Sequence, residues 1–180
     1  MISLIVVFWM YVILLAAVGA MRGWAKELLV SFSVVLCLAL NHVLKKYIPL
    51  VSMLPVVPAE GTTPYLFWIR ASVLAGLVYF GYQTVVSIPH LAGKATRERL
   101  ADTLFGLVMG AFNGYLIVGT VWFYLHEAQY PFPNIIEAPR GDLLKVVERM
   151  MAFMPPRLLG EPWIYFAVIL AFVFVLVVFI

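Results

Sequence analysis

The side chains of this chain that could do chemistry are few, and they lie far apart. The three histidines, His42, His90 and His126, lie near the ends of apolar segments and share no spacing typical of metal ligands. His42 lies within an apolar stretch, where a histidine could ligate a haem or a chlorophyll-type pigment. A lone histidine at such a place is more often an interfacial polar residue. We therefore predict no metal site.

The candidate nucleophiles also lack partners in the sequence. Ser31, Ser33 and Ser72 have no histidine nearby that could act as the base a serine nucleophile requires. Cys37 is the only cysteine, which excludes an intrachain disulfide and a zinc site that depends on cysteine. We predict no catalytic residue, no enzymatic activity and no cofactor, apart from bound lipid.

The composition indicates that the chain is a membrane protein. Hydrophobic residues make up 64% of the chain and charged residues 12%, and the mean hydropathy is +1.03. Soluble domains have roughly half apolar and a quarter charged residues. The net charge of +3 comes from basic residues scattered between apolar segments, which argues against a nucleic-acid partner. Membrane lipids are the expected partners.

Five apolar segments are long enough to cross a bilayer, which takes about 20 residues. We expect the first to be a retained membrane helix and not a cleaved signal, because no basic residue precedes its apolar run. The five segments are Ile2–Ala20, Trp24–Leu44, Tyr65–Ile88, Thr103–Leu125 and Trp163–Ile180.

The connections between these segments predict two tight hairpins. Residues 21–23 join the first pair and residues 89–99 join the second, whereas residues 50–64 and 126–141 are proline-rich and predict extended loops. Residues 142–154 form an amphipathic pattern that predicts a short helix, either in the interface or capping the bundle from outside. The expected fold is an all-α membrane protein with about five transmembrane helices and one interfacial amphipathic helix.

This fold divides into three parts. Residues 1–125 are a four-helix transmembrane unit, residues 126–162 are the proline-rich loop with the amphipathic helix, and residues 163–180 are a C-terminal transmembrane helix. Basic residues concentrate in the short hairpin connections, which predicts that the hairpin tips face the cytoplasm.

One face of the fourth segment carries a ridge of glycines. Gly106, Gly110 and Gly114 recur every fourth residue, and such a ridge lets a neighbouring helix approach closely in lipid. Asn113 lies beside the ridge, where its amide needs a partner across a helix contact. We predict that these four residues pack helices against each other, in the bundle and against other membrane subunits.

Several charged residues mark the helix ends and the turns. Arg22, Lys26 and Glu27 cluster at the first turn, either as a solvated turn that compensates the helix dipole or as a docking point for a cytoplasmic partner. Asp102 is predicted to cap the fourth helix. Arg70, inside the third segment, is expected to snorkel to the headgroups, with an ion pathway as the alternative.

Two stretches together resemble the colicin V production protein family. Residues 22–27, Arg-Gly-Trp-Ala-Lys-Glu, resemble the family's turn after the first span, and residues 102–114 resemble its second motif, an aspartate followed by regularly spaced glycines. The resemblance covers about residues 1–125. Thr103 and Asn113 depart from it, since the family often has arginine at both positions. The resemblance implies a multi-pass protein of the bacterial cytoplasmic (inner) membrane that is associated with toxin production or export and has no established enzymatic activity.

We therefore expect a non-enzymatic scaffold, or an assembly or accessory subunit, that joins other integral membrane subunits through glycine-mediated helix packing. One alternative is a homo-oligomeric transporter or channel for a small solute, in which Asn41, Arg70, Gln83 and Asn113 would line one path. Another is an accessory subunit of a respiratory or photosynthetic complex, with a pigment or quinone near His42.

Overall fold

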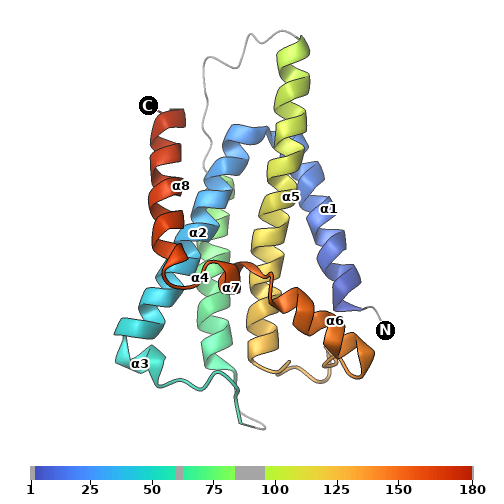
Figure 1. The fold of residues 1–180 in the computed structure, drawn as a ribbon, viewed down its shortest axis with the longest axis vertical. Coiled ribbons are helices and arrows are strands. Elements are labelled where there is room, and N and C mark those ends of the chain that lie inside the picture. The colour runs from blue at the N-terminus through green and yellow to red at the C-terminus, as the bar shows by residue number, and fades with distance from the viewer. Residues whose placement is uncertain (1–2, 60–62, 84–95, 180) are drawn as a thin grey trace.

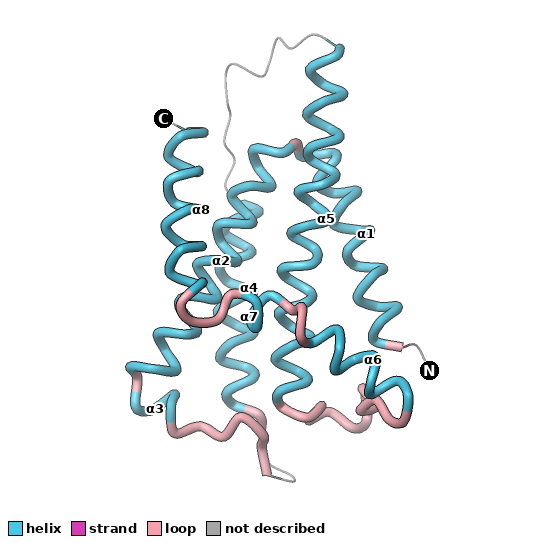
Figure 2. The backbone as a smooth tube through the Cα atoms, viewed as in Figure 1, coloured by secondary structure: helices cyan, strands magenta, loops and turns pink. Residues whose placement is uncertain are grey.

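The computed structural model describes residues 3–59, 63–83 and 96–179, and within these ranges the protein is all-helical (Figures 1 and 2). The predicted all-α membrane architecture is confirmed. The helices are α1 (Leu4–Arg22), α2 (Trp24–Tyr47), α3 (Pro49–Ser52), α4 (Tyr65–Gln83), α5 (Thr96–Glu127), α6 (Asp142–Met151), α7 (Pro155–Leu158) and α8 (Trp163–Phe179).

Four helices are long and apolar enough to cross a membrane: α1, α2, α4 and the Arg99–Glu127 part of α5. The fifth apolar helix, α8, has 17 residues in the described part of the chain, which is shorter than the roughly 20 residues that span a bilayer. The chain is thus a multi-pass membrane protein with four full-length spans and one shorter apolar helix.

The observed bounds differ from the predicted ones in several places. Helix α5 begins at Thr96, well before the predicted start at Thr103. The loop predicted over residues 50–64 contains part of the short helix α3, and the amphipathic helix ends at Met151, so that Pro155 begins α7. Residues 84–88 of the third predicted segment and residues 89–95 of the second predicted connection lie outside the described residues.

Helix α5 is the central element of the bundle (Figure 1). It packs along α1 and also contacts α2 and α4, while α2 packs on α4 and α8. The two helices of the first hairpin diverge from their turn and α5 lies between them, so the tight packing of α1 on α2 that the short connection suggested does not occur. The short turn joins two helices whose main neighbours are other helices.

Glycines allow α1 and α5 to touch backbone to backbone. A Cβ atom placed on Gly110 would lie 2.9 Å from the Cα atom of Gly19, and one on Gly114 would lie 2.8 Å from the Cα atom of Val12. Gly106 meets Gly23 in the same way, at 3.2 Å. These separations leave no room for side chains, so α1 covers the glycine ridge of α5 within the chain.

Helix α6 closes one end of the bundle. Its Val147 and Met151 are buried in a cluster that includes Phe8 of α1 and Trp122 of α5, whereas Leu143, one turn before Val147 on the same side of the helix, is exposed. This amphipathic helix therefore packs onto the bundle, as one of its two predicted placements requires.

The substitution Gly110→Ala tests the α1–α5 contact. The added methyl group would meet the α1 backbone, so we expect the free energy of unfolding to fall by about 1–3 kcal/mol, as for other overpacked sites. Gly76→Ala on α4 is the matched control, because a Cβ atom there has no atom within 4 Å. Unfolding in mixed micelles, followed by circular dichroism, measures both variants, and equal stabilities would contradict the close approach.

Candidate functional site

Asp102 of α5 holds the turn between α1 and α2. Its Oδ1 atom accepts a hydrogen bond from the backbone N–H of Trp24 at 3.3 Å and so satisfies a free donor at the start of α2. Gly23 has a φ of 85°, and a Cβ atom there would lie 2.9 Å from Asp102 Oδ2, so conformation and space both require glycine. The prediction that Asp102 caps its own helix is wrong, because α5 begins at Thr96 and continues through this residue.

Glu27 lies at the centre of a buried polar network next to this turn. Its side chain has no exposed surface, and Oε1 accepts a hydrogen bond from Arg22 Nη1 at 2.6 Å. Arg22 also donates from Nη2 to the backbone oxygen of Tyr82 at 2.9 Å, and its guanidinium lies 4.4 Å from the centre of the Tyr82 ring. Arg22 therefore ties the turn to α4 through Tyr82.

Asn113 completes the network from α5. Its Nδ2 atom donates to Glu27 Oε2 and to the Glu27 backbone oxygen, each at 2.8 Å. Ser31 donates from Oγ to Asn113 Oδ1 at 2.6 Å. We call these residues the turn cluster; its members are Arg22, Glu27, Ser31, Tyr82 and Asn113.

The turn cluster joins α1, α2, α4 and α5 through an ion pair and hydrogen bonds. Two of its side chains, Glu27 and Asn113, are completely buried and have no access to water. The turn was predicted to be either a solvated surface or an exposed docking point. Neither prediction holds for Glu27, because its carboxylate is buried. Lys26 is half-buried and makes none of the hydrogen bonds of the cluster. Asn113 meets α2, while the neighbouring glycines meet α1.

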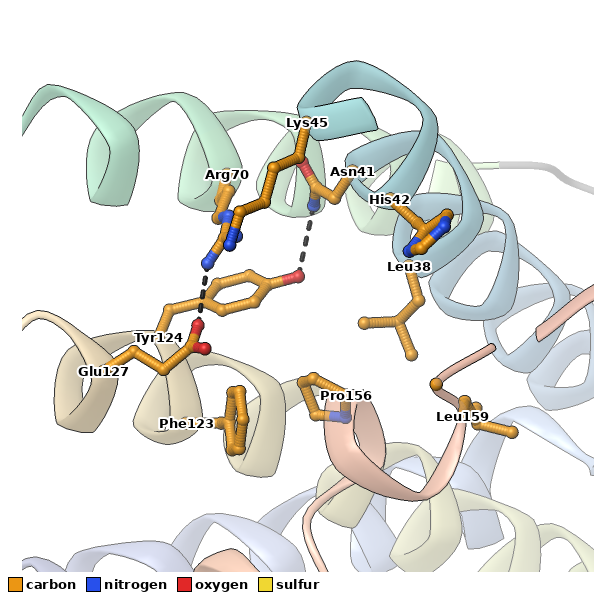
Figure 3. Close-up of a pocket in the computed structure, with 11 residues that line it drawn as sticks. Leu38, Asn41, His42, Lys45, Arg70, Phe123, Tyr124, Glu127, Pro156 and Leu159 are labelled. Carbon is orange, nitrogen blue, oxygen red and sulfur yellow. Dashed lines mark hydrogen bonds and ion pairs between the residues drawn. The ribbon is translucent and has the colours of Figure 1, made fainter. Parts of the chain in front are cut away.

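A second polar site lies at the opposite end of the bundle (Figures 1 and 3). Arg70 of α4 is only 9% exposed and donates from Nη1 to Glu127 Oε2 at 2.8 Å. Its guanidinium lies 5.0 Å from the centre of the Tyr124 ring, and the Tyr124 hydroxyl accepts from Asn41 Nδ2 at 3.3 Å. The expectation that Arg70 snorkels outward is wrong, because the side chain faces a carboxylate inside the bundle.

These residues line a cavity of about 200 Å³ between α2, α4, α5 and α7, which we call the polar pocket. Sequence reasoning missed it, since it singled out Arg70 but not Glu127. A signal was present: a charge inside an apolar helix needs a charged partner, and Glu127 ends the neighbouring span. The lining residues are Leu38, Asn41, His42, Lys45, Arg70, Phe123, Tyr124, Glu127, Pro156, Leu159 and Gly160.

The histidines of the described chain have other partners. His42 Nε2 lies 2.9 Å from Glu161 Oε1, and His126 Nδ1 lies 3.1 Å from the Tyr130 hydroxyl. His90 lies outside the described residues. Ser33 donates to the backbone oxygen of Leu29, so no nucleophile is paired with a histidine base at these positions. Within residues 3–59, 63–83 and 96–179, no group of three or more acidic, histidine or cysteine side chains could hold a metal ion.

Glu161 anchors the start of α8 to α2. Its Oε1 atom accepts hydrogen bonds from Lys46 Nζ and from the Tyr165 hydroxyl, both at 2.7 Å, in addition to its contact with His42. These partners, Lys46 above all, favour the carboxylate and lower the pKa of Glu161 to about 2.

No family model, curated protein or solved structure matches the chain.

The substitution Glu27→Ala tests the turn cluster. It leaves Arg22 without its carboxylate, and we expect a loss of about 3 kcal/mol in the free energy of unfolding, as for other broken buried ion pairs. The double variant Arg22→Met with Glu27→Leu removes both charges and should recover part of that loss. The control is Lys26→Gln in the same turn, because this half-buried lysine makes none of the hydrogen bonds of the cluster, and we expect a change within about 0.5 kcal/mol. A Glu27→Ala variant as stable as the control would refute the role of the cluster.

The Glu161 anchor should depend on pH. Because the folded protein lowers the pKa of Glu161 from 4.5 to about 2, the anchor is fully present above pH 4.5 and is lost as the pH falls toward 2. Spin labels at the exposed positions Leu36 and Val173 report the distance between α2 and α8. We expect the distance distribution to broaden over this pH range.

Two variants isolate this carboxylate from the others. Glu161→Gln should give the broad distribution already at neutral pH, whereas Glu137→Gln, at an exposed loop position, should behave as the wild type. If the distribution of α2–α8 distances stays narrow in Glu161→Gln, the Glu161 anchor does not hold α8 in place.

Proposed function

We propose that this protein is a non-enzymatic scaffold or accessory subunit of a membrane complex, and that it joins other integral membrane proteins through the outward side of α8. The observation that carries the proposal is the exposed apolar surface of α8. This helix has no charged residue, it rests on α2 along one side, and most of its large apolar side chains are exposed. In Figure 1 it stands at the edge of the bundle, away from α1.

The side chains of α8 suit contact with another protein. Phe166 is 63% exposed and Leu170 is 70% exposed, and both lie on the side away from the buried Ile164. Aromatic residues contribute strongly to protein interfaces because they bury large areas with few rotatable bonds.

The glycine ridge does not serve this purpose. We expected partners to use Gly106, Gly110 and Gly114, yet α1 covers all three within the chain. A scaffold function then has to rely on surfaces outside the α1–α5 contact, which leaves α8 as the apolar helix with the least support from the bundle.

The positions of the polar side chains in the bundle support a scaffold function over a transporter function. A transporter would require Asn41, Arg70, Gln83 and Asn113 to line one path. Asn113 is hydrogen-bonded in the turn cluster, whereas Asn41 and Arg70 line the polar pocket at the other end, and Gln83 bonds the Tyr79 hydroxyl at an exposed position. These groups are separated along the bundle instead of forming a continuous lumen.

The resemblance to the colicin V production protein family supports a bacterial cytoplasmic membrane as the location. The residues that carry it come together: Arg22 and Glu27 pair with each other, Asp102 holds Trp24, and Gly106 touches the same turn. Arg22, Lys26 and Arg99 lie at this end, which by the positive-inside rule we assign to the cytoplasm.

Co-purification of alanine variants tests the proposal. The protein is purified in mild detergent from its own membranes, and subunits present in stoichiometric amounts are identified by mass spectrometry. We expect a partner that is lost in the double variant Phe166→Ala with Leu170→Ala. The matched control, Leu104→Ala with Phe105→Ala, removes equally exposed apolar side chains from α5 and should retain it.

Either of two results would contradict the proposal. One is a chain that migrates alone, or with a second copy of itself, in wild type and variants alike. The other is equal loss of the partner in both double variants.

A further inference from the structure

The polar pocket has the properties of a binding site and not of a gap in packing. Its volume of about 200 Å³ exceeds that of a few water molecules but is smaller than the roughly 300–1,000 Å³ of pockets that hold drug-sized ligands. Polar side chains from α2, α4 and α5 converge on it, and apolar side chains, among them Leu38 and Phe123, line the remainder (Figure 3).

The pocket carries an excess of positive charge. Lys45 and Arg70 line it together with a single carboxylate, that of Glu127, while the histidine at its edge, His42, is paired with Glu161 outside it. Arg70 uses Nη1 for Glu127, and a guanidinium has five N–H donors in all. Within the described chain, Lys45 makes no hydrogen bond or ion pair, and Figure 3 shows its side chain extending along the pocket toward Arg70.

One buried acceptor in this pocket lacks a donor. Asn41 is 6% exposed, and its Nδ2 atom is shared between Cys37 Sγ and the Tyr124 hydroxyl, both at 3.3 Å. Its Oδ1 atom has no hydrogen-bond partner. Because leaving a buried acceptor unpaired is unfavourable, a ligand that donates a hydrogen bond here would be stabilised.

The pocket lies at the helix ends that carry exposed aromatic residues, where lipid headgroups are expected. It lies at the C-terminal ends of α2 and α5 and the N-terminal part of α4, at the end of the spans opposite the α1–α2 turn (Figure 1). The exposed aromatic residues Tyr47, Tyr65 and Trp68 belong to the same helix ends. Such residues mark the level of the lipid headgroups.

We propose that the polar pocket binds the headgroup of an anionic phospholipid whose headgroup carries a hydroxyl, a phosphoglycerol group. The phosphate lies between Lys45 and Arg70, and the headgroup hydroxyl donates to Asn41 Oδ1. The apolar side chains Leu38 and Phe123 face the glycerol backbone and the start of the acyl chains. A soluble glycerol phosphate offers the same chemistry without the acyl chains, so the test must distinguish the two sources.

Lipid retention measured by native mass spectrometry tests this proposal. The delipidated protein in mild detergent is titrated with phosphatidylglycerol, with phosphatidylcholine of the same acyl chains, and with glycerol phosphate. We expect saturable binding of phosphatidylglycerol, and weaker binding of phosphatidylcholine, which has no net negative charge and no headgroup donor.

Substitutions connect that binding to the pocket. Lys45→Gln should weaken phosphatidylglycerol binding about tenfold, as expected for one lost charge-assisted contact. Asn41→Leu should reduce the preference over phosphatidylcholine. Lys145→Gln on α6 is the matched control, since this lysine is exposed and distant from the lining residues, and it should bind as the wild type. Lys45 is exposed, so its variant should keep the wild-type circular dichroism spectrum.

Each possible result supports or contradicts lipid binding in the polar pocket. Binding that is equally weakened by Lys45→Gln and Lys145→Gln, or by neither, would overturn the proposal, as would equal binding of the two phospholipids. Glycerol phosphate bound as tightly as the lipid, with the same dependence on Lys45, would retain the phosphate site but identify its ligand as soluble. These outcomes do not depend on whether α8 binds a partner.

Discussion

The burial of one carboxylate constrains the whole bundle. Glu27 sits among apolar helices without access to water, and such a charge is tolerated only when cations and donors surround it. Arg22 supplies the charge and Asn113 supplies an amide donor, from two different helices. For these groups to meet, α5 must come very close to the α1–α2 turn, and glycines are what allow this approach. The polar network and the glycine ridge are thus two requirements of one contact.

This contact also explains why the two polar sites differ in character. At the turn cluster, Arg22 and Asn113 occupy both carboxylate oxygens of Glu27, and the adjoining backbone is held by a hydrogen bond to α5. At the other end the helices spread apart, so Arg70 and Glu127 pair at the side of a cavity and an acceptor on Asn41 stays open. The first arrangement suits a rigid joint and the second suits a ligand. A scaffold that holds lipid at one end of its spans would use both.

The sequence predicts much of this fold because apolar length and glycine spacing act locally. The spans, the glycine ridge and the need of Asn113 for a partner all follow from residues close together in the chain. The partners themselves do not, because Glu27 and Asn113 are 86 residues apart, and Arg70 and Glu127 are 57 apart. Asp102 was misassigned for a related reason: helix-forming residues precede it, and polar residues outside a bilayer extend a helix without an apolar signal.

The distance along the chain between Glu27 and Asn113 has a consequence for biosynthesis. The first hairpin is made and must enter the membrane before the ribosome has produced α5, so its carboxylate has only Arg22 as a partner during that interval. A charge in lipid is costly while its pairing is incomplete. The hydrogen bonds from Asn113 to Glu27 form only once α5 has been made, so this carboxylate is fully paired only in the finished bundle.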